Sequence, residues 1–266
     1  LKDKALQIRM DILNAIKKAK KGHIGGSYSI VEILVALYYG KIIQFDSKNP
    51  KSEKRDRLLL SKGHAGVALY AVLADLGFFP KEEMNFLNNK KMLGEHPDQF
   101  IPGIEFVSGS LGHGLSIAAG MALSDVFDNK AKRKTFVILG DGECYEGSVW
   151  EAANFAAHHK LKNLCAIIDR NMLITHGSTE EINALEPINQ KFLSFGWDVH
   201  EVDGHNISQL KNSFLDIPFI RNTPNALICH TIKGKGFHFA EQNPEWHHKS
   251  RLSKDEIDLM YKLTED

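Results

Sequence analysis

Residues 135–142 read Thr-Phe-Val-Ile-Leu-Gly-Asp-Gly, and residues 164–171 read Leu-Cys-Ala-Ile-Ile-Asp-Arg-Asn. Each run of apolar residues stops at polar side chains, which is typical of a buried parallel strand. The segment between them, Ser148–His159, has the spacing of a helix. We therefore expect a β-α-β unit that delivers Asp141 and Asn171, thirty positions apart, to the same edge of a sheet.

The rest of the chain repeats this alternation of short strands and longer helices. Further strands are expected at Arg57–Leu60, Val199–Val202 and Ala226–Thr231, and further helices at His113–Phe127 and Glu186–Phe195. The pattern predicts an α/β fold with a mostly parallel sheet and helices on both faces. No stretch has the composition of an interdomain linker, so we expect one domain over residues 1–266.

Two helix starts are indicated by their first residues. Ser29 and Glu32 have the spacing of a capping box, for a helix that ends near Gly40. Pro80 is suited to begin another helix, because its fixed φ is compatible with the first turn.

Charge and cysteine usage argue against several classes of protein. The 33 basic and 33 acidic residues cancel, so the balance indicates neither a nucleic-acid nor a membrane-surface partner. The first 20 residues mix charged and apolar side chains at helical spacing, unlike a signal peptide. Three cysteines without a CxxC spacing favour neither a disulfide framework nor a zinc site. We expect a cytoplasmic protein with reduced thiols.

Asp141 and Asn171 would form a site for a hard cation. Carboxylate and amide oxygens suit Mg²⁺ or Ca²⁺ rather than a soft metal. Gly140 and Gly142 leave room for a diphosphate to approach the backbone, and Gly142 can offer its N–H group. The alternative is that Asp141 belongs to an ordinary glycine-rich turn and that Asn171 only closes a strand.

Histidines are frequent in the glycine-rich loops. Thirteen are present, and none has the spacing of a zinc motif such as HExxH. Imidazoles titrate near neutrality, so they can donate to phosphate oxygens or transfer protons. The alternative for any one of them is a surface or turn residue. The loop histidines are His23, His64, His96, His113, His247 and His248.

The chain resembles the N-terminal part of transketolases from end to end. The Gly140-Asp141-Gly142 to Asn171 pair is similar to the thiamine-diphosphate motif. The other matching stretches are 22–27 (Gly-His-Ile-Gly-Gly-Ser), 56–64 (Asp-Arg-Leu-Leu-Leu-Ser-Lys-Gly-His), 95–98 (Glu-His-Pro-Asp), 109–114 (Gly-Ser-Leu-Gly-His-Gly), 233–236 (Lys-Gly-Lys-Gly) and 245–247 (Glu-Trp-His).

The resemblance implies a thiamine diphosphate cofactor held through Mg²⁺ or Ca²⁺. The metal ligands would be Asp141, Asn171 and the backbone carbonyl of Leu173. Residues implied to contact the cofactor itself are His64, Gly109, Leu111, Gly142, Glu146 and Asn171. Among these, His64 and Gly142 would face the diphosphate, and Gly109 and Leu111 would line the aminopyrimidine pocket.

The resemblance also assigns roles to histidines and to two acidic residues. The residues implied to face the reacting sugar and to transfer protons are His23, His64, His96 and His247. Glu146 and Glu151 match acidic positions that in the family lie at the dimer interface and link two active sites. The alternative for both is a charged first turn of the helix over 148–159.

Two positions depart from the family pattern. His113 stands where many full-length members have Gln, as in shorter two-chain members, and its role is open. His248 replaces the Gly that usually follows the Trp-His pair, which puts the shape of the sugar channel beside His247 in doubt.

In the family a second module holds the aminopyrimidine, and its glutamate protonates that ring. We therefore expect the partner of this chain to be a C-terminal transketolase subunit, with self-association of like chains to form a heterotetramer. The chain is either one gene product of such a split enzyme or a fragment. Ser253, with Glu256 three residues later, predicts a capped amphipathic helix over 253–263, and this favours a natural end.

The expected activity is transfer of a two-carbon ketol unit from a ketose phosphate to an aldose. The alternatives are another thiamine-diphosphate enzyme, such as a deoxyxylulose-phosphate synthase or an oxo-acid dehydrogenase subunit, and a non-catalytic assembly subunit. A Mg-nucleotide module is disfavoured because the chain has no GxxxxGK[ST] loop. The sequence does not indicate which sugars are used.

Overall fold

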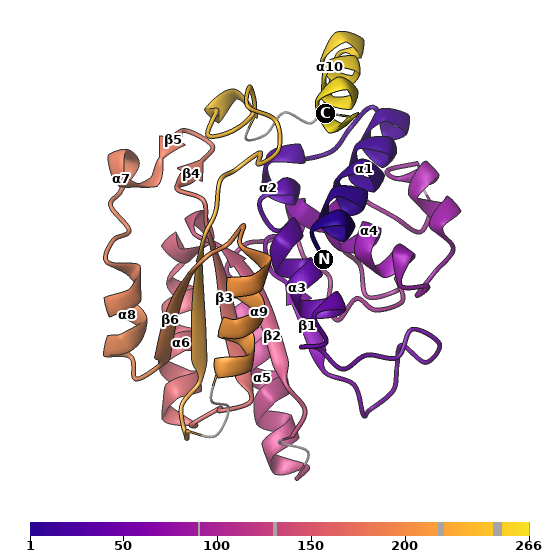
Figure 1. The fold of residues 1–266 in the computed structure, drawn as a ribbon. Helices are drawn as coiled ribbons and strands as arrows, with labels where there is room; N and C mark the ends of the chain where they lie inside the picture. Colours follow the sequence, from indigo (N-terminus) through magenta and orange to yellow (C-terminus); the bar gives the residue numbers. More distant parts are fainter. Residues whose placement is uncertain (90, 130–131, 218–220, 247–251, 266) are drawn as a thin grey trace.

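A parallel sheet occupies the centre of the molecule (Figure 1). The computed structural model describes residues 1–89, 91–129, 132–217, 221–246 and 252–265. Within these residues the strand order is β1-β2-β3-β7-β6, and every neighbouring pair is parallel. The strands are β1 (Arg57–Leu60), β2 (Thr135–Gly140), β3 (Leu164–Arg170), β6 (Asp198–Asp203) and β7 (Asn225–His230). A short antiparallel pair, β4 (Leu173–Ile174) and β5 (Gly177–Ser178), follows β3.

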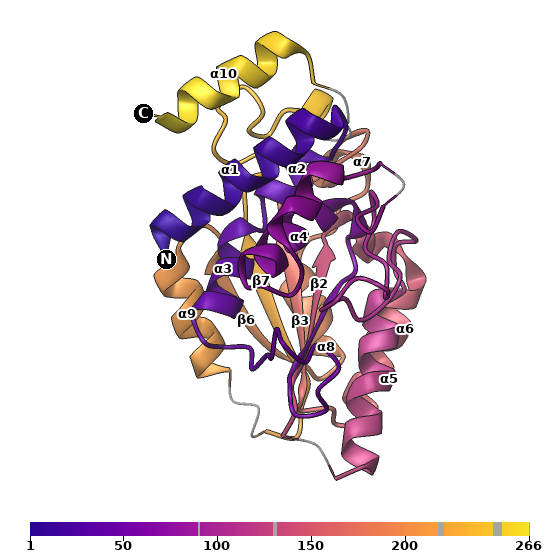
Figure 2. The ribbon, with the colours of Figure 1, turned by 90° about the vertical axis from the view of Figure 1, so that its right-hand side faces the viewer.

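Helices cover both faces of this sheet, with α3 and α9 on one side and α5 and α6 on the other (Figure 2). The α-helices are α1 (Lys2–Ala19), α2 (Ile24–Tyr28), α3 (Val31–Tyr39), α4 (Gly66–Asp75), α5 (Gly114–Phe127), α6 (Gly147–His158), α7 (Thr179–Ile182), α8 (Ile188–Ser194), α9 (Ile207–Asp216) and α10 (Lys254–Glu265). Short 3₁₀ helices are η1 (Gly63–Ala65), η2 (Lys81–Phe86), η3 (Gly142–Tyr145) and η4 (Pro244–Trp246).

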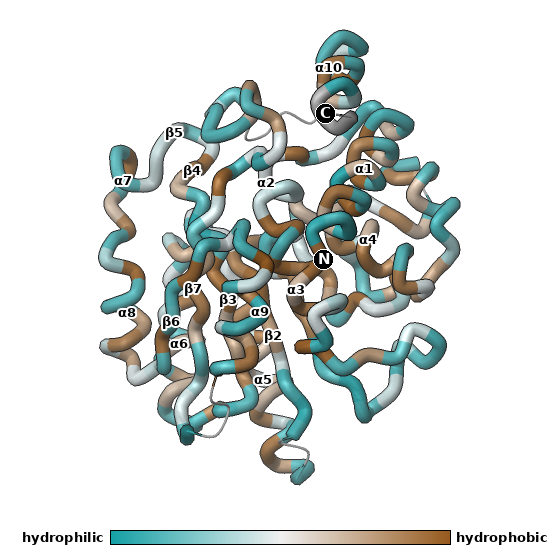
Figure 3. Tube along the Cα trace, viewed as in Figure 1, coloured by the Kyte–Doolittle hydropathy of each residue, from teal (hydrophilic) through white to brown (hydrophobic). Residues whose placement is uncertain are grey.

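Alternate residues of each strand enter two separate cores. Phe136 and Ile138 of β2 pack in the core beneath α3 and α9. Val137 and Leu139, which point to the opposite face, pack in the core beneath α5 and α6. Figure 3 shows the result, with apolar residues concentrated in the strands and polar residues along the outer helices and loops. Because both faces are buried, the strands carry continuous apolar runs.

The order of the strands explains why α9 covers a different face from α5 and α6. The chain runs outward from β1 to β2 to β3, passes to β6 at the edge, and then returns through α9 to β7. Parallel crossovers are right-handed, so a reversal of direction moves the connecting helix to the other face. The loops that follow β3, β6 and β7 therefore meet at one edge of the sheet.

Most of the predicted elements are confirmed. The strands expected at Arg57–Leu60, Val199–Val202 and Ala226–Thr231 agree with β1, β6 and β7 to within one residue at each end. The β-α-β unit that places Asp141 and Asn171 at one edge is also present. Pro80 does begin a helical segment, but η2 is a 3₁₀ helix.

The predicted capping box of Ser29 and Glu32 is wrong. The residue before α3 is Ile30, and neither predicted partner caps the helix. The Ser29 hydroxyl instead donates to Asp169 Oδ2 at 2.8 Å, and Glu32 pairs with Arg9. The predicted end of α3 at Gly40 is confirmed.

The second predicted capping box is formed. The backbone N–H of Glu256 donates to Ser253 Oγ at 3.2 Å, and the N–H of Ser253 donates to Glu256 Oε2 at 2.8 Å. Helix α10 begins at the next residue, Lys254.

All three cysteines are buried, and none of them forms a disulfide. Burial raises the pKa of the thiols of Cys144, Cys165 and Cys229 above their ordinary value. None of the helices that the structure describes combines the length and apolar composition needed to cross a lipid bilayer.

A buried carboxylate fastens α5 to the strands. Asp125 is fully buried and accepts hydrogen bonds from Arg57 Nη1 at 3.0 Å and from Arg133 Nε at 3.0 Å. Arg57 begins β1, and Arg133 lies just before β2. The pair of guanidinium groups therefore joins the end of α5 to both strands.

We expect Asp125→Ala to lower the free energy of unfolding by roughly 3 kcal/mol, because it leaves two partly buried guanidinium groups without their carboxylate. Asp128→Ala is the matched control, since Asp128 is exposed one turn later. Urea denaturation followed by circular dichroism measures both variants. Equal stabilities would show that this ion cluster does not hold α5 in place.

Candidate active site

A cavity of about 260 Å³ opens at the carboxyl ends of β2 and β3. Parallel sheets of this kind bind ligands at that edge. The cavity contains seven of the residues singled out from the sequence, which come from four separate segments. They are His64, Leu111, Asp141, Gly142, Glu146, Asn171 and Leu173.

Asp141 is buried at the floor of this cavity. Its Oδ1 accepts from the N–H of Gly142 at 2.8 Å, and its Oδ2 accepts from the N–H of Met172 at 2.6 Å and from Arg170 Nη1 at 3.0 Å. Burial raises the pKa of the carboxyl, and the neighbouring Asp169 carboxylate raises it further. A cation beside Asp141 would relieve this unfavourable negative charge.

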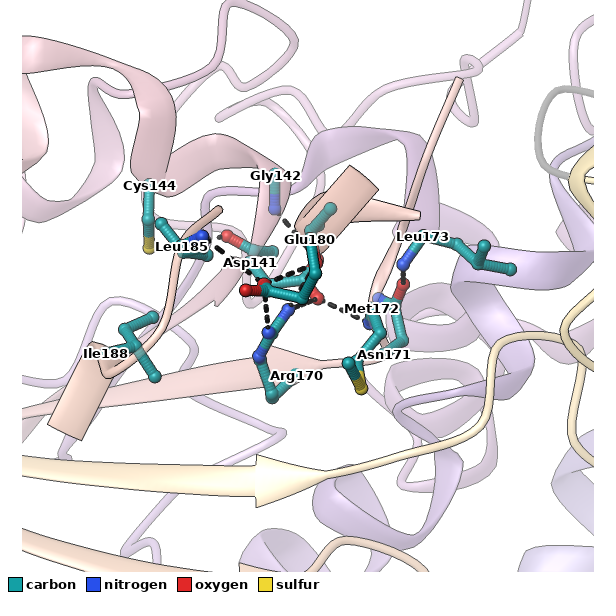
Figure 4. Close-up of polar contacts among 12 residues, drawn as sticks. Asp141, Gly142, Cys144, Arg170, Asn171, Met172, Leu173, Glu180, Leu185 and Ile188 are labelled. Carbon is teal, nitrogen blue, oxygen red and sulfur yellow. Dashed lines mark hydrogen bonds and ion pairs between the residues drawn. The ribbon is translucent and has the colours of Figure 1, made fainter. Parts of the chain in front are cut away.

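The amide of Asn171 has a fixed orientation. Its Nδ2 donates to Asp169 Oδ2 at 3.0 Å, which leaves Oδ1 to accept from the N–H of Leu173 at 3.1 Å. Met172, between them, has a φ of 65°, so residues 171–173 turn sharply. The turn places Asn171 and Leu173 near Asp141 (Figure 4), and all three residues line the cavity.

Arg170 joins Asp141 to the segment that carries α7. Its side chain is fully buried, and besides Asp141 it donates to Thr179 Oγ1 at 2.8 Å, to Glu180 Oε1 at 2.6 Å and to Glu186 Oε1 at 2.8 Å. Figure 4 shows the guanidinium between Asp141 and Glu180. Arg170 thus pairs with three carboxylates, so the guanidinium alone does not balance the negative charge of this cluster.

Two buried lysines face the same cavity, and sequence reasoning gave them no role. Lys62 Nζ pairs with Asp169 and donates to the carbonyl of Gly26 at 3.0 Å. Lys233 Nζ donates to the carbonyl of Leu173 at 3.2 Å. Burial, reinforced by the nearby Lys62 ammonium, lowers the pKa of Lys233 to about 7. The position of Lys233 in a glycine-flanked loop just after β7 is the signal that could have identified it.

The structure brings His23 and His64 together. Their ring centroids lie 5.9 Å apart at nearly a right angle, and only His64 lines the cavity. His23 Nε2 lies 3.0 Å from Glu95 Oε1, and Lys21 pairs with the other oxygen of Glu95. A carboxylate accepts only, so Nε2 carries the proton. Glu95 thus fixes the ring of His23, which the sequence did not indicate.

The remaining predicted residues lie around this centre. His96 is exposed and packs on Gly109, where an added Cβ would lie 3.4 Å from the imidazole. His113 Nδ1 donates to the carbonyl of Leu111 at 3.0 Å and faces solvent. Glu151 is exposed on α6 and is absent from the cavity lining. His247 and His248 lie outside the described residues.

Glu143 is a further buried carboxylate that the sequence did not reveal. It accepts from the Ser61 hydroxyl, from the N–H of Gly112 at 2.8 Å and from the N–H of Gly140 at 3.2 Å. These donors follow β1, precede α5 and end β2, respectively. Glu143 therefore connects three segments that border the cavity through hydrogen bonds.

Among the residues that the structure describes, no three His, Cys, Asp or Glu side chains gather as a metal site. The oxygen donors of the three predicted metal ligands, all of which line the cavity, are one carboxylate, one side-chain amide and one backbone carbonyl. This set is hard and has few charges, which fits a cation that also takes ligands from a bound anion.

Comparison with known proteins agrees with this geometry. The family described as transketolase, thiamine diphosphate binding domain, matches residues 2–264. The chain belongs to this family. Its fold is thus a thiamine-diphosphate-binding fold, and membership makes it part of a transketolase, an enzyme that transfers a two-carbon ketol unit by means of thiamine diphosphate.

Relatives include two proteins named as subunits. One, from Phocaeicola vulgatus, is named as one of the subunits of an apulose-4-phosphate transketolase. It is 44% identical over 241 residues, which are 90% of this chain and 85% of that protein. The 6-deoxy-6-sulfo-D-fructose transketolase subunit SqwG of a Clostridium species is 44% identical over 243 residues, 91% of this chain and 88% of that protein.

A solved transketolase has the same fold. The Pichia stipitis enzyme in complex with sedoheptulose 7-phosphate superposes with a TM-score of 0.91 at 28% identity. The match covers 99% of this chain but only 41% of that one. The chain therefore spans less than half the length of the full-length enzyme.

We expect Gly142→Ala to weaken the binding of thiamine diphosphate at least about tenfold, because the added Cβ would overlap Ile174 Cγ2 in the cavity wall. Gly147→Ala is the control, since an added Cβ there meets nothing within 4 Å. Titration calorimetry with Mg²⁺ present measures both affinities. If both variants bind like the wild type, the cavity beside Gly142 does not receive the cofactor.

Proposed function

We propose that Asp141, Asn171 and the backbone carbonyl of Leu173 hold a divalent cation, Mg²⁺ or Ca²⁺, that carries the diphosphate of the cofactor. The observation behind this proposal is that these three residues, each of which carries a hard oxygen atom, line one cavity. The raised pKa of Asp141 supports it, since a cation would stabilise the ionised carboxylate. The fixed amide of Asn171 supports it as well, because the bond from Nδ2 to Asp169 identifies the other atom of the amide as the oxygen.

The cofactor would extend from this cation toward the loop before α5. His64 and Gly142 would contact the diphosphate, Asn171 would serve both the cation and the cofactor, and Gly109 and Leu111 would border the aminopyrimidine. To this set we add Lys233, whose buried ammonium lies beside Leu173 and can neutralise phosphate charge. Glu146, at the cavity rim, would face a neighbouring chain, as would Glu151.

The histidines would act on the sugar. Thiamine diphosphate supplies, when bound, the group that carries the two-carbon unit between a ketose phosphate and an aldose. His64 would donate to the sugar hydroxyls, His23 would accept a proton from them at Nδ1, and His96 and His247 would complete this set. The Glu95 carboxylate keeps the proton of His23 on Nε2, which leaves Nδ1 as the basic atom of that ring.

We further propose that residues 1–266 form one domain that acts with a second chain carrying the pyrimidine-binding module. Relatives of similar length are themselves named as subunits. Ile117 and Phe155 are large exposed apolar residues on the adjacent helices α5 and α6, which supports self-association through that face into a heterotetramer. The three reduced, buried thiols suit a cytoplasmic enzyme.

We expect Asp141→Asn to abolish Mg²⁺-dependent binding of thiamine diphosphate while the protein stays folded, because the variant keeps the shape of the side chain and loses its charge. Chelation of the metal with EDTA should have the same effect on the wild type. Asp128→Asn is the control at an exposed carboxylate. Calorimetry measures the affinities for thiamine diphosphate. An unchanged affinity of the Asp141→Asn variant would contradict the proposed metal site.

We expect the purified chain to turn over no donor sugar alone and to gain ketol transfer when the partner chain is added. The reason is that the chain corresponds to less than half of the Pichia stipitis enzyme. Fructose 6-phosphate serves as the donor, and sedimentation measures the mass of the complex. Robust turnover by the chain alone would mean that the two-chain proposal is wrong.

A further inference from the structure

The loop after β7 carries Lys233 into the active-site cavity. The loop is held at several points: the N–H of Gly234 donates to the carbonyl of Gly25 at 3.1 Å, and the side-chain hydroxyl of Thr231 donates to Asp169. Gly234 has a φ of 80°, so the chain turns immediately after the lysine. The place of the ammonium group therefore depends on how this short loop is fixed.

His205 fixes the residue on one side of Lys233. It lies between β6 and α9, and its Nε2 accepts from the backbone N–H of Ile232 at 2.7 Å. A nitrogen that accepts carries no proton, so the imidazole is neutral and its proton is on Nδ1. That Nδ1 lies 3.0 Å from Glu32 Oε2 and donates to it. Both nitrogens of His205 are thus committed.

Arg9 fixes the other side through the same carboxylate. Its Nη1 and Nη2 donate to the two oxygens of Glu32 at 2.5 and 2.9 Å, and its Nε donates to the carbonyl of Lys235 at 3.3 Å. Burial would raise the pKa of Glu32, but hydrogen bonds from His205 and Arg9 outweigh burial and lower it to about 2. Glu32 is therefore a charged group that is connected, through His205 and Arg9, to the backbone one residue before and two residues after Lys233.

This network lies outside the cavity. None of Arg9, Glu32 and His205 lines it, and they come from α1, from α3 and from the loop before α9. Figures 1 and 2 show α3 and α9 side by side on the face of the sheet opposite α5 and α6. An ion cluster that only joined these helices would not need to bond the backbone at Ile232 and Lys235.

We propose that His205 and Glu32 are positioning residues for the reaction: they hold the backbone on both sides of Lys233 and so keep its ammonium group at the diphosphate site. This inference rests on the proposed role of Lys233 toward the cofactor. It assigns a function to two side chains that touch neither the cavity nor the predicted metal ligands.

Two substitutions of His205 separate its two hydrogen bonds. In His205→Gln the amide oxygen reaches the place of Nε2 and still accepts from Ile232. In His205→Asn the amide nitrogen takes the place of Nδ1 and still donates to Glu32, but Ile232 has no acceptor. The control is His230→Asn, an exposed histidine at the end of β7 that pairs with Glu201 outside the network.

With the partner chain present, we expect His205→Asn to weaken thiamine diphosphate binding about tenfold, because the partly buried N–H of Ile232 loses its acceptor and the loop can move. His205→Gln and His230→Asn should stay within about threefold of the wild type. Hydrogen exchange of the cofactor-free protein should be faster at Ile232 only in the Asn variant. In a Lys233→Met background, His205→Asn should have no further effect on affinity, because its effect acts through the lysine.

The possible results distinguish a failure of the positioning role from a failure of the proposed function. Equal losses in the Gln and Asn variants, or an Asn effect that persists in Lys233→Met, would overturn the positioning role and leave His205 as a packing residue. A wild-type protein that fails to bind thiamine diphosphate would refute the proposed function, and the inference with it. If the wild type binds thiamine diphosphate and the His205→Asn variant binds it with the same affinity, only the inference is refuted.

Discussion

Asp169 carries the buried negative charge around which the active-site edge is arranged. It is fully buried and accepts from Lys62, which follows β1, from Ser29, from Thr231, which follows β7, and from the amide of Asn171. Burial would raise its pKa, but Lys62 and the hydrogen bonds outweigh burial and lower it. A buried charge without these partners would cost several kcal/mol, so segments that are distant in sequence must meet at this carboxylate.

The strands could be predicted because their signal is local. Apolar runs such as Thr135–Leu139 indicate burial on both faces whatever the rest of the chain does. Capping was predictable only at the surface. The Ser253 and Glu256 box formed at the protein surface, between two side chains only three positions apart. Ser29 and Glu32 have the same spacing, yet their polar groups are used by Asp169, Arg9 and His205, and such distant partners leave no trace in spacing.

Some residues of the candidate site could likewise be predicted from local sequence, and others could not. Asp141 and Asn171 could be placed together because parallel strands end at one edge. The sequence did not predict the charged residues around them. Arg170, Lys62 and Glu143 act through contacts between separate loops, which sequence spacing does not indicate. His64 and His23 lie in contact, and the hydrogen bond that supports His23 is made to Glu95, which is 72 positions away in the sequence. His247 remains a prediction from the resemblance alone.

The burial of the three native thiols gives the folded chain a practical property. Cys144, Cys165 and Cys229 are at most 1% exposed, and their raised pKa leaves almost no thiolate at neutral pH. A thiol-reactive dye would therefore discriminate against them in favour of a new cysteine at the surface. A fluorophore could be attached near the cavity rim without removing any native cysteine, so that cofactor loading and docking of the partner chain could be followed in real time on an otherwise unaltered sequence.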